Sequence, residues 1–187
     1  MHFKQLAFGN NWEIDLEDHK DSRGLFREVF SKTEINRETG SSFDPVQQNF
    51  SISSKGVLRG IHFSLVPGGQ QKWITCLNGS ILDCIVDLRE NSPSFGEHVL
   101  IQLDSERPKA ILIGEGMGHG FLSLKDETSV NYLLSSPYNS QLEFSIDPFD
   151  SELAIEWPVM DYILSKKDES AATLNSFKTT RNLPQNL

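Results

Sequence analysis

The chain has 187 residues, of which 37% are hydrophobic and 23% are charged, proportions typical of a soluble globular protein with one core of ordinary size. Its formal net charge of −9 argues against nucleic acid or an anionic membrane surface as the main partner, so any anionic ligand requires a local basic cluster. No apolar segment approaches membrane-spanning length, and residues 1–6 lack the apolar core of a signal peptide. The two cysteines suit a reducing compartment. We expect one cytoplasmic domain over residues 1–187, with a polar tail at residues 170–187.

In chain order, short strands alternate with turns rich in glycine and proline. Alternating polar and apolar side chains, or short apolar runs, predict strands at residues 12–17, 25–30, 47–53, 54–63, 71–77, 80–88, 98–103, 110–113, 129–135 and 142–146. A capping box that begins at Ser31 predicts one short helix, which Gly40 would end. The sequence contains no long amphipathic helix and no internal repeat. This pattern predicts an all-β sandwich or barrel.

The strand at residues 54–63 carries two polar candidates, Arg59 and His62, among apolar residues. Because side chains alternate across a strand, His62 shares a face with Leu58. Arg59 lies on the other face unless a bulge at Gly60 turns it toward His62. Taken alone, His62 is best explained as a hydrogen-bonded core histidine, and only the rest of the chain can favour a functional role.

The next two strands flank Asn78-Gly79, a strong signal for a β-hairpin. A two-residue turn would place Lys72 and Asp83 on one face as diagonal neighbours. An exposed ion pair would contribute little to stability. The same face carries four apolar residues, which favours a buried or cavity-lining pair: Ile74, Cys76, Ile81 and Ile85. Farther on, the glycine-rich residues 114–121 lack a following helix, so they predict a sharp turn that exposes His119 and no dinucleotide site.

A series of short motifs runs in one order across nearly the whole chain: residues 21–28, 47–49, 56–63, 71–72 with 87–89, 92–96, 116–121, Tyr132 with Tyr138, 156–158 and 164–168. Together they resemble the dTDP-4-dehydrorhamnose 3,5-epimerase family. The resemblance implies a cupin-type antiparallel jelly roll (double-stranded β-helix) with short peripheral helices. Residues 62–69 and 132–138 are more similar to the mono-epimerases of deoxysugar pathways, which invert one carbon.

The resemblance implies epimerisation of a nucleotide-linked 4-keto-6-deoxyhexose at C3, C5 or both, in deoxysugar biosynthesis, without a cofactor or metal. Both carbons are α to the ketone, so their protons can be removed if the enolate is stabilised. In the family pattern, His62 is the base, which Asp168 orients, and Tyr132 is the acid on the opposite face. Lys72 would stabilise the enolate oxygen. The inverted carbon and the nucleotide base stay open.

The resemblance also implies the substrate-binding residues. Arg23 and Arg59 match diphosphate contacts, and Phe26 and Tyr138 match aromatic groups that sandwich the nucleotide base. The other matched binding positions are Glu28, Gln47, Asn49, His119, Glu143 and Lys167, with Asp83 in a supporting place. Family dimers exchange N-terminal strands, which implies a homodimer in which Arg23, Phe26 and Glu28 serve the neighbour's site.

Three other functions compete with the epimerase interpretation. A metal-dependent cupin would need two closely spaced histidines, but Ser64 stands two positions after His62, and His119 with Lys72 completes a poor ligand set. A nucleotide-sugar 3,4-ketoisomerase is disfavoured by the matches at Asp168 and Tyr132. A non-catalytic sugar-binding cupin would not need the base, the acid and the lysine together.

Overall fold

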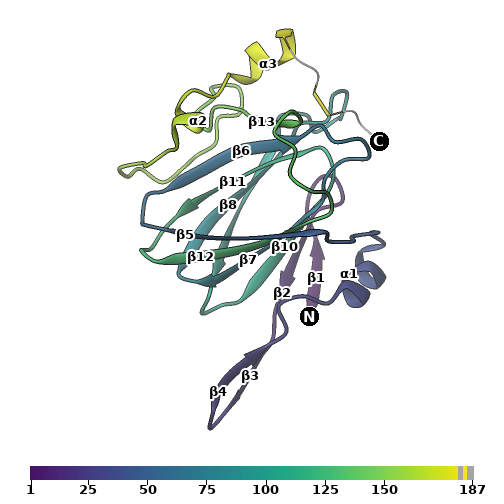
Figure 1. Cartoon of the computed structure of the whole chain (residues 1–187), viewed down its shortest axis with the longest axis vertical. Helices are drawn as coiled ribbons and strands as arrows, with labels where there is room; N and C mark the ends of the chain where they lie inside the picture. Colours follow the sequence, from purple (N-terminus) through teal and green to yellow (C-terminus); the bar gives the residue numbers. More distant parts are fainter. Residues whose placement is uncertain (181–182, 185–187) are drawn as a thin grey trace.

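The computed structural model describes residues 1–180 and 183–184, which fold mainly into two antiparallel sheets (Figure 1). The six-stranded sheet has the order β1 (His2–Gln5), β2 (Trp12–Asp15), β10 (Lys109–Ile113), β7 (Lys72–Asn78), β12 (Thr128–Leu134) and β5 (Gln47–Ser53). The five-stranded sheet has the order β13 (Glu143–Ser145), β6 (Leu58–Ser64), β11 (Met117–Ser123), β8 (Ser80–Asp87) and β9 (His98–Asp104). A separate ribbon pairs β3 (Asp18–Asp21) with β4 (Gly24–Arg27). The described helices are α1 (Lys32–Thr39), α2 (Lys166–Glu169) and α3 (Leu174–Thr180). The prediction of a mostly antiparallel β protein with short helices is confirmed.

Apolar side chains from both sheets fill the space between them. Ile74 on β7 and Ile85 on β8 are fully buried in this shared cluster. The outer face of the five-stranded sheet is covered by the C-terminal segment, where Phe177 packs edge-on against Phe63 with ring centroids 5.0 Å apart. Trp73 lies in a third cluster, on the outer face of the six-stranded sheet beside α1. None of the described helices is long and apolar enough to span a membrane.

The predicted hairpin of residues 71–77 and 80–88 is wrong. β7 pairs with β10 and β12, whereas β8 pairs with β11 and β9, so Asn78-Gly79 is a corner where the chain leaves one sheet for the other. Both strands are largely buried, and each has a neighbour on both sides in its own sheet. The turn signal therefore predicted the change of direction correctly, while tertiary pairing decided the partners. Lys72 and Asp83 still interact, because both strands contribute side chains to the same interior.

The bulge considered at Gly60 is present. Along the β6–β11 pair, His62 lies opposite His119 and Arg59 lies opposite Phe121, with a shift of register between them. Gly60 has a φ of +116° and lies against the β11 backbone, a conformation and an approach that glycine permits. The bulge brings Arg59 and His62, three residues apart, to the same cavity.

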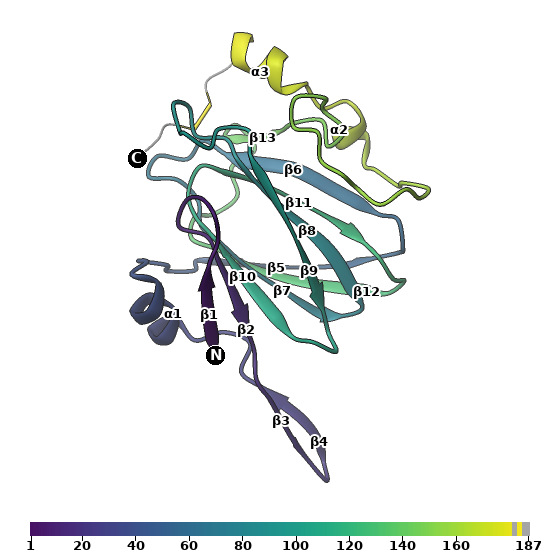
Figure 2. The ribbon, with the colours of Figure 1, turned by 180° about the vertical axis from the view of Figure 1, so that it is seen from behind.

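The expected polar tail is partly wrong. Residues 174–180 form α3, and Leu174 and Phe177 are buried on the five-stranded sheet. The sequence pattern missed this helix because its apolar positions are few and the segment is short. Residues 181–182 and 185–187 of the expected tail lie outside the described residues. At the other end, the β3–β4 ribbon extends away from both sheets (Figures 1 and 2).

Candidate active site

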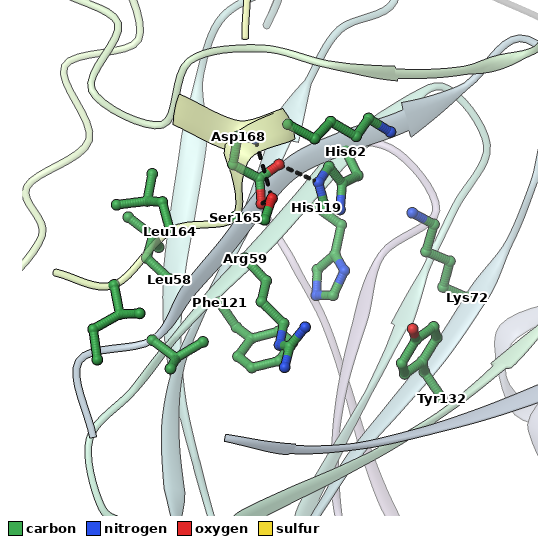
Figure 3. A pocket seen from close by; sticks show the side chains of 13 residues that line it. Leu58, Arg59, His62, Lys72, His119, Phe121, Tyr132, Leu164, Ser165 and Asp168 are labelled. Atoms are coloured by element: carbon green, nitrogen blue, oxygen red, sulfur yellow. Dashed lines mark hydrogen bonds and ion pairs between the residues drawn. The ribbon is translucent and has the colours of Figure 1, made fainter. Parts of the chain in front are cut away.

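One pocket of about 400 Å³ opens between the two sheets and is bordered by the segment before α2 (Figure 3). Strands β6, β7, β11 and β12 all contribute to its lining. It brings together seven of the predicted site residues: Arg59, His62, Lys72, His119, Tyr132, Lys167 and Asp168. Residues from both halves of the chain therefore meet in one cavity.

The His62 imidazole lies against the Asp168 carboxylate, with Nε2 2.7 Å from Oδ1. The side chain of His62 is 35% exposed, whereas that of Asp168 is 3% exposed. Burial raises the pKa of the Asp168 carboxyl, but hydrogen bonds from His62, Ser165 and the Gly60 amide outweigh burial and leave the pKa below its ordinary value. An ionised carboxylate at Nε2 holds a proton there, so neutral His62 keeps its lone pair on Nδ1. This arrangement suits a general base.

A second histidine–carboxylate pair lies deeper, beside Lys72. His119 Nε2 is 2.7 Å from Asp83 Oδ2, while the other oxygen, Oδ1, is buried and has no hydrogen-bond partner within the described residues. Lys72 is 7% exposed. Burial lowers the pKa of its ammonium, and the negative charges of Glu143 and Asp83 act in the opposite direction. A buried amine at this place can stabilise negative charge that develops on a bound oxygen.

His62 and Tyr132 reach the pocket from different sheets. His62 lies on β6 and Tyr132 on β12, and Figure 3 shows the two side chains on opposite sides of the pocket. Tyr132 is held in register by its cross-strand neighbours Asn49 and Ile74. A molecule bound between them would face an imidazole on one side and a phenol on the other. Such a pair can remove a proton from one face of a carbon and return one to the opposite face.

Two exposed cations, Arg59 and Lys167, border the same pocket. The Arg59 Nε donates to Ser53 Oγ at 3.2 Å, which leaves its terminal nitrogens for other acceptors. With Lys72, these side chains form the local basic cluster that an anionic ligand needs on a chain of net charge −9. Among residues 1–180 and 183–184, no group of three or more His, Cys, Asp or Glu side chains is arranged to hold a metal ion.

Comparison with known proteins shows the family. The sequence matches the dTDP-4-dehydrorhamnose 3,5-epimerase family over residues 5–176. This chain belongs to that family. A dTDP-4-dehydrorhamnose 3,5-epimerase of Mycolicibacterium smegmatis is 42% identical over 98% of this chain and 91% of its own length. The predicted family and enzyme class, a nucleotide-sugar epimerase, are confirmed.

Solved structures of epimerases also resemble this member of the family. A 4-keto-6-deoxy sugar epimerase from the novobiocin gene cluster of Streptomyces spheroides superposes with a TM-score of 0.94 at 37% identity, over 99% of this chain and 93% of that one. A 3'-monoepimerase of Streptomyces bikiniensis, solved in complex with dTDP-quinovose, gives a TM-score of 0.93 at 37% identity and the same coverage of each chain. The relatives thus include both 3,5-epimerases and mono-epimerases.

Five further predicted site residues do not line the pocket. Gln47 Nε2 donates to Asn49 Oδ1 at 3.0 Å, and its Oε1 accepts the Tyr138 amide at 2.8 Å, so these three residues form one group next to β12. Tyr138 is 61% exposed. Burial lowers the Lys72 pKa, and Glu143 is near enough for its negative charge to oppose that lowering. Asp83 is hydrogen-bonded to His119.

The other three predicted binding residues lie on or next to the β3–β4 ribbon, away from this pocket. Arg23 pairs with Asp21 at the ribbon's turn, and its side chain is 89% exposed. Phe26 is 69% exposed, and Glu28, just after β4, is also exposed. Within one chain the structure therefore does not bring these residues to His62.

Sequence reasoning missed several residues of the pocket wall. Five of them are apolar: Val57, Leu58, Phe121, Ile163 and Leu164. The sixth is Ser165, the N-cap of α2, whose side chain accepts from the Asp168 amide. A signal was present, because Ser165 and Asp168 are spaced as the cap and third residue of a helix start. The parity of β6 predicted Leu58 on the His62 face, but the bulge at Gly60 leaves Leu58 packed with Ile61 and Phe63 in the outer cluster, from which it still lines the pocket.

Proposed function

We propose that this chain epimerises a nucleotide-linked 4-keto-6-deoxyhexose at C3, C5 or both, on a cupin-type jelly roll, in deoxysugar biosynthesis. The observation that carries the proposal is the opposition of His62, with its carboxylate partner Asp168, to Tyr132 across a pocket that also contains Lys72. Two solved relatives support a nucleotide-sugar substrate, because one is a 4-keto-6-deoxy sugar epimerase and the other was solved in complex with dTDP-quinovose.

In this mechanism, Nδ1 of His62 takes the proton from a carbon next to the C4 ketone. The electron pair of the broken C–H bond moves to the C4 oxygen, where Lys72 stabilises the enolate. Tyr132 gives its proton to the opposite face of the same carbon, and the ketone re-forms with that centre inverted. His62 then returns a proton to solvent and Tyr132 takes one up, so the enzyme is unchanged after each turnover.

The basic residues at the pocket would hold the diphosphate. Arg59 offers a planar fork of donors that suits phosphate oxygens, and Lys167 adds a second positive charge on α2. His119, whose ring is hydrogen-bonded to Asp83, would contact the sugar. The group of Gln47, Asn49 and Tyr138 provides amides and an exposed aromatic ring for the nucleotide.

Proton exchange in deuterated water tests the proposal. The purified protein, after treatment with a chelator, is mixed with dTDP-, CDP- and GDP-linked 4-keto-6-deoxyglucose, and deuterium at C3 and C5 is followed by NMR. We expect wild type to incorporate deuterium with inversion at C3, C5 or both. His62→Ala should abolish exchange, whereas Tyr132→Phe should permit exchange without inversion at that centre.

The matched controls are His98→Ala on β9 and Tyr162→Phe on the C-terminal segment, neither of which lines the pocket. A substrate with ¹³C at C4 separates the rival reaction, because an epimerase keeps that carbon as a ketone and a 3,4-ketoisomerase converts it to an alcohol carbon. Absence of exchange with all three nucleotides would refute the epimerase proposal. Binding without exchange would favour a sugar-binding cupin.

We also propose a homodimer in which the β3–β4 ribbon completes the neighbour's site. Support comes from the ribbon's extension from the body and from the exposure of Phe26 and Leu25, which are 69% and 51% exposed. Isolated two-stranded ribbons are marginally stable in water, so an apolar ribbon that extends from a sheet is expected to pack on a partner.

Mixing two inactive variants tests this exchange. If Arg23 acts across the dimer, a mixed dimer of Arg23→Ala and His62→Ala contains one site with both residues intact. Random reassociation should then restore about a quarter of wild-type activity, since half of the dimers are mixed and each has one intact site. No gain in activity after mixing, with mixed dimers seen by native mass spectrometry, would show that Arg23 does not act in trans.

A further inference from the structure

We propose that Ser165 is a positioning residue for the base, because it fixes the Asp168 carboxylate so that Oδ1 faces His62. The inference rests on the proposed function. It assigns to a residue outside the predicted site a role that acts through Asp168.

Ser165 contacts Asp168 twice with one hydroxyl group. Its Oγ donates to Asp168 Oδ2 at 2.9 Å and accepts the Asp168 amide at 3.1 Å. The hydroxyl thus links the backbone and the carboxylate of the same residue. Because the other oxygen, Oδ1, accepts from His62 Nε2 at 2.7 Å, each oxygen of this buried carboxylate has its own donor (Figure 3).

The segment that carries Ser165 is fastened to the strand that carries His62. The Leu58 amide donates to the Ile163 carbonyl at 3.0 Å, and the Ile163 amide donates to the Gly56 carbonyl at 2.9 Å. These bonds set the distance between α2 and the start of β6. They do not involve the Asp168 carboxylate, which is held by donors from the Ser165 hydroxyl, the His62 imidazole and the Gly60 amide.

The rotation matters for the chemistry of His62. A carboxylate that accepts from Nε2 holds that proton in place and leaves the lone pair on Nδ1. Without the Ser165 hydroxyl, the buried carboxylate would keep only the donors of His62 and the Gly60 amide, and it could turn away from the imidazole. His62 would then sample both neutral tautomers, of which only one has its lone pair on the nitrogen that faces away from Asp168.

The test combines an NMR signature that needs no substrate with steady-state kinetics. In ¹⁵N-labelled wild type, His62 should show a protonated Nε2 with a slowly exchanging, downfield proton. In Ser165→Ala, this proton should broaden or disappear and the ring nitrogens should report mixed tautomers. We expect kcat to fall about 10–100-fold, the range for loss of a partner that orients a functional group, with KM little changed.

Three further variants separate positioning from helix capping. Ser165→Thr keeps the hydroxyl and should restore both the NMR signature and kcat. Ser170→Ala, at the other end of α2, removes a hydrogen bond to the Lys166 carbonyl without touching the carboxylate, and should behave as wild type. Ser165→Gly removes the hydroxyl at a small capping cost, so it serves if the alanine variant does not fold.

The inference is overturned if Ser165→Ala or Ser165→Gly keeps the wild-type tautomer and kcat, or if Ser170→Ala loses them to the same degree. Its failure is distinct from failure of the proposed function. If wild type catalyses no exchange but the His62 tautomer depends on Ser165, the positioning role stands and the epimerase proposal falls. If wild type catalyses exchange and the His62 tautomer is independent of Ser165, the epimerase proposal stands and the positioning role falls.

Discussion

Asp168 lies 106 residues after His62 in the chain, yet its Oδ1 is 2.7 Å from the His62 Nε2. A four-residue helix, α2, and a strand at the centre of the proposed site, β6, thereby form one functional unit. The buried carboxylate gives the half-exposed imidazole a fixed tautomer, and removing its charge should disable the base without unfolding the chain.

Asp168→Asn is expected to lower kcat for deuterium exchange by roughly 10³-fold, because an amide can present a donor to His62 and favour the wrong tautomer. KM should change little, since Asp168 is 3% exposed and lies behind the imidazole. The matched control is Asp161→Asn, an exposed carboxylate on the segment that leads to α2. Near-wild-type kcat in the Asp168 variant would show that His62 does not need this carboxylate.

Lys72→Met should lower kcat by about 10²–10³-fold, the loss found when one donor to a developing oxyanion is removed. Methionine has a similar length and no charge, so the change tests the ammonium itself. The variant should stay folded, because Lys72 makes no ion pair within 4 Å in the described part of the chain and burial already lowers its pKa. The control is Lys32→Met, a 51% exposed lysine paired with Asp44. A similar kcat in both variants would remove Lys72 from the mechanism.

The sequence predicted the residue types of the site better than the pairing of the strands. The parity of β7 and β8 correctly grouped Lys72 with Asp83, but the predicted hairpin between them does not exist. The alternation of side chains between the two faces of a strand depends only on local backbone geometry, so it is the same whichever sheet the strand joins. Pairing depends on the other strands that compete for each edge, and a turn signal at Asn78-Gly79 contains no information about them.

Long-range contacts at the site were predictable only through resemblance to a family. Nothing in the periodicity of residues 164–168 indicates that Asp168 meets His62 from a distant segment. Ser165 was present in a matched motif, but its role required the positions of both carboxylate oxygens. The Gly60 bulge was partly predictable from the sequence. A glycine inside a strand indicates a bulge, but it does not indicate the direction in which Arg59 turns.

Asp87 should make stability depend on pH in acid. Its fully buried carboxylate accepts hydrogen bonds from Arg89, Ser92 and Ser94. Burial acts to raise its pKa, but these donors outweigh burial and lower it from 3.8 to about 2. Because the folded pKa is below the unfolded one, the stabilisation is complete above about pH 4 and is lost as pH falls toward 2. The loss should be about 2 kcal/mol.

Urea unfolding of wild type and Asp87→Asn between pH 7 and pH 2.5 measures this effect. The variant should be less stable at neutral pH and should lose less stability across the acid window, so the two curves converge at low pH. Asp15→Asn, which removes a 58% exposed carboxylate, is the control and should keep the wild-type pH dependence. Parallel curves for wild type and Asp87→Asn would mean that another group dominates the acid transition.

Gly60→Ala should be far more destabilising than Gly68→Ala, although φ is positive at both positions. A Cβ at Gly60 would lie 2.5 Å from the Gly120 Cα and 2.7 Å from the His119 carbonyl oxygen. Both atoms belong to the backbone of β11, so no side chain can move aside, and β6 would have to separate from β11. We expect a loss of roughly 3–5 kcal/mol.

Gly68→Ala is the matched control. Gly68 also has a positive φ, +80°, but a Cβ there would meet no atom within 4 Å. Its replacement should cost only the backbone strain, about 1–2 kcal/mol. Chemical denaturation of both variants gives the difference, and kcat per folded molecule reports whether His62 and Arg59 have moved with β6. Equal losses at the two positions would mean that conformation, and not the contact with β11, requires glycine at residue 60.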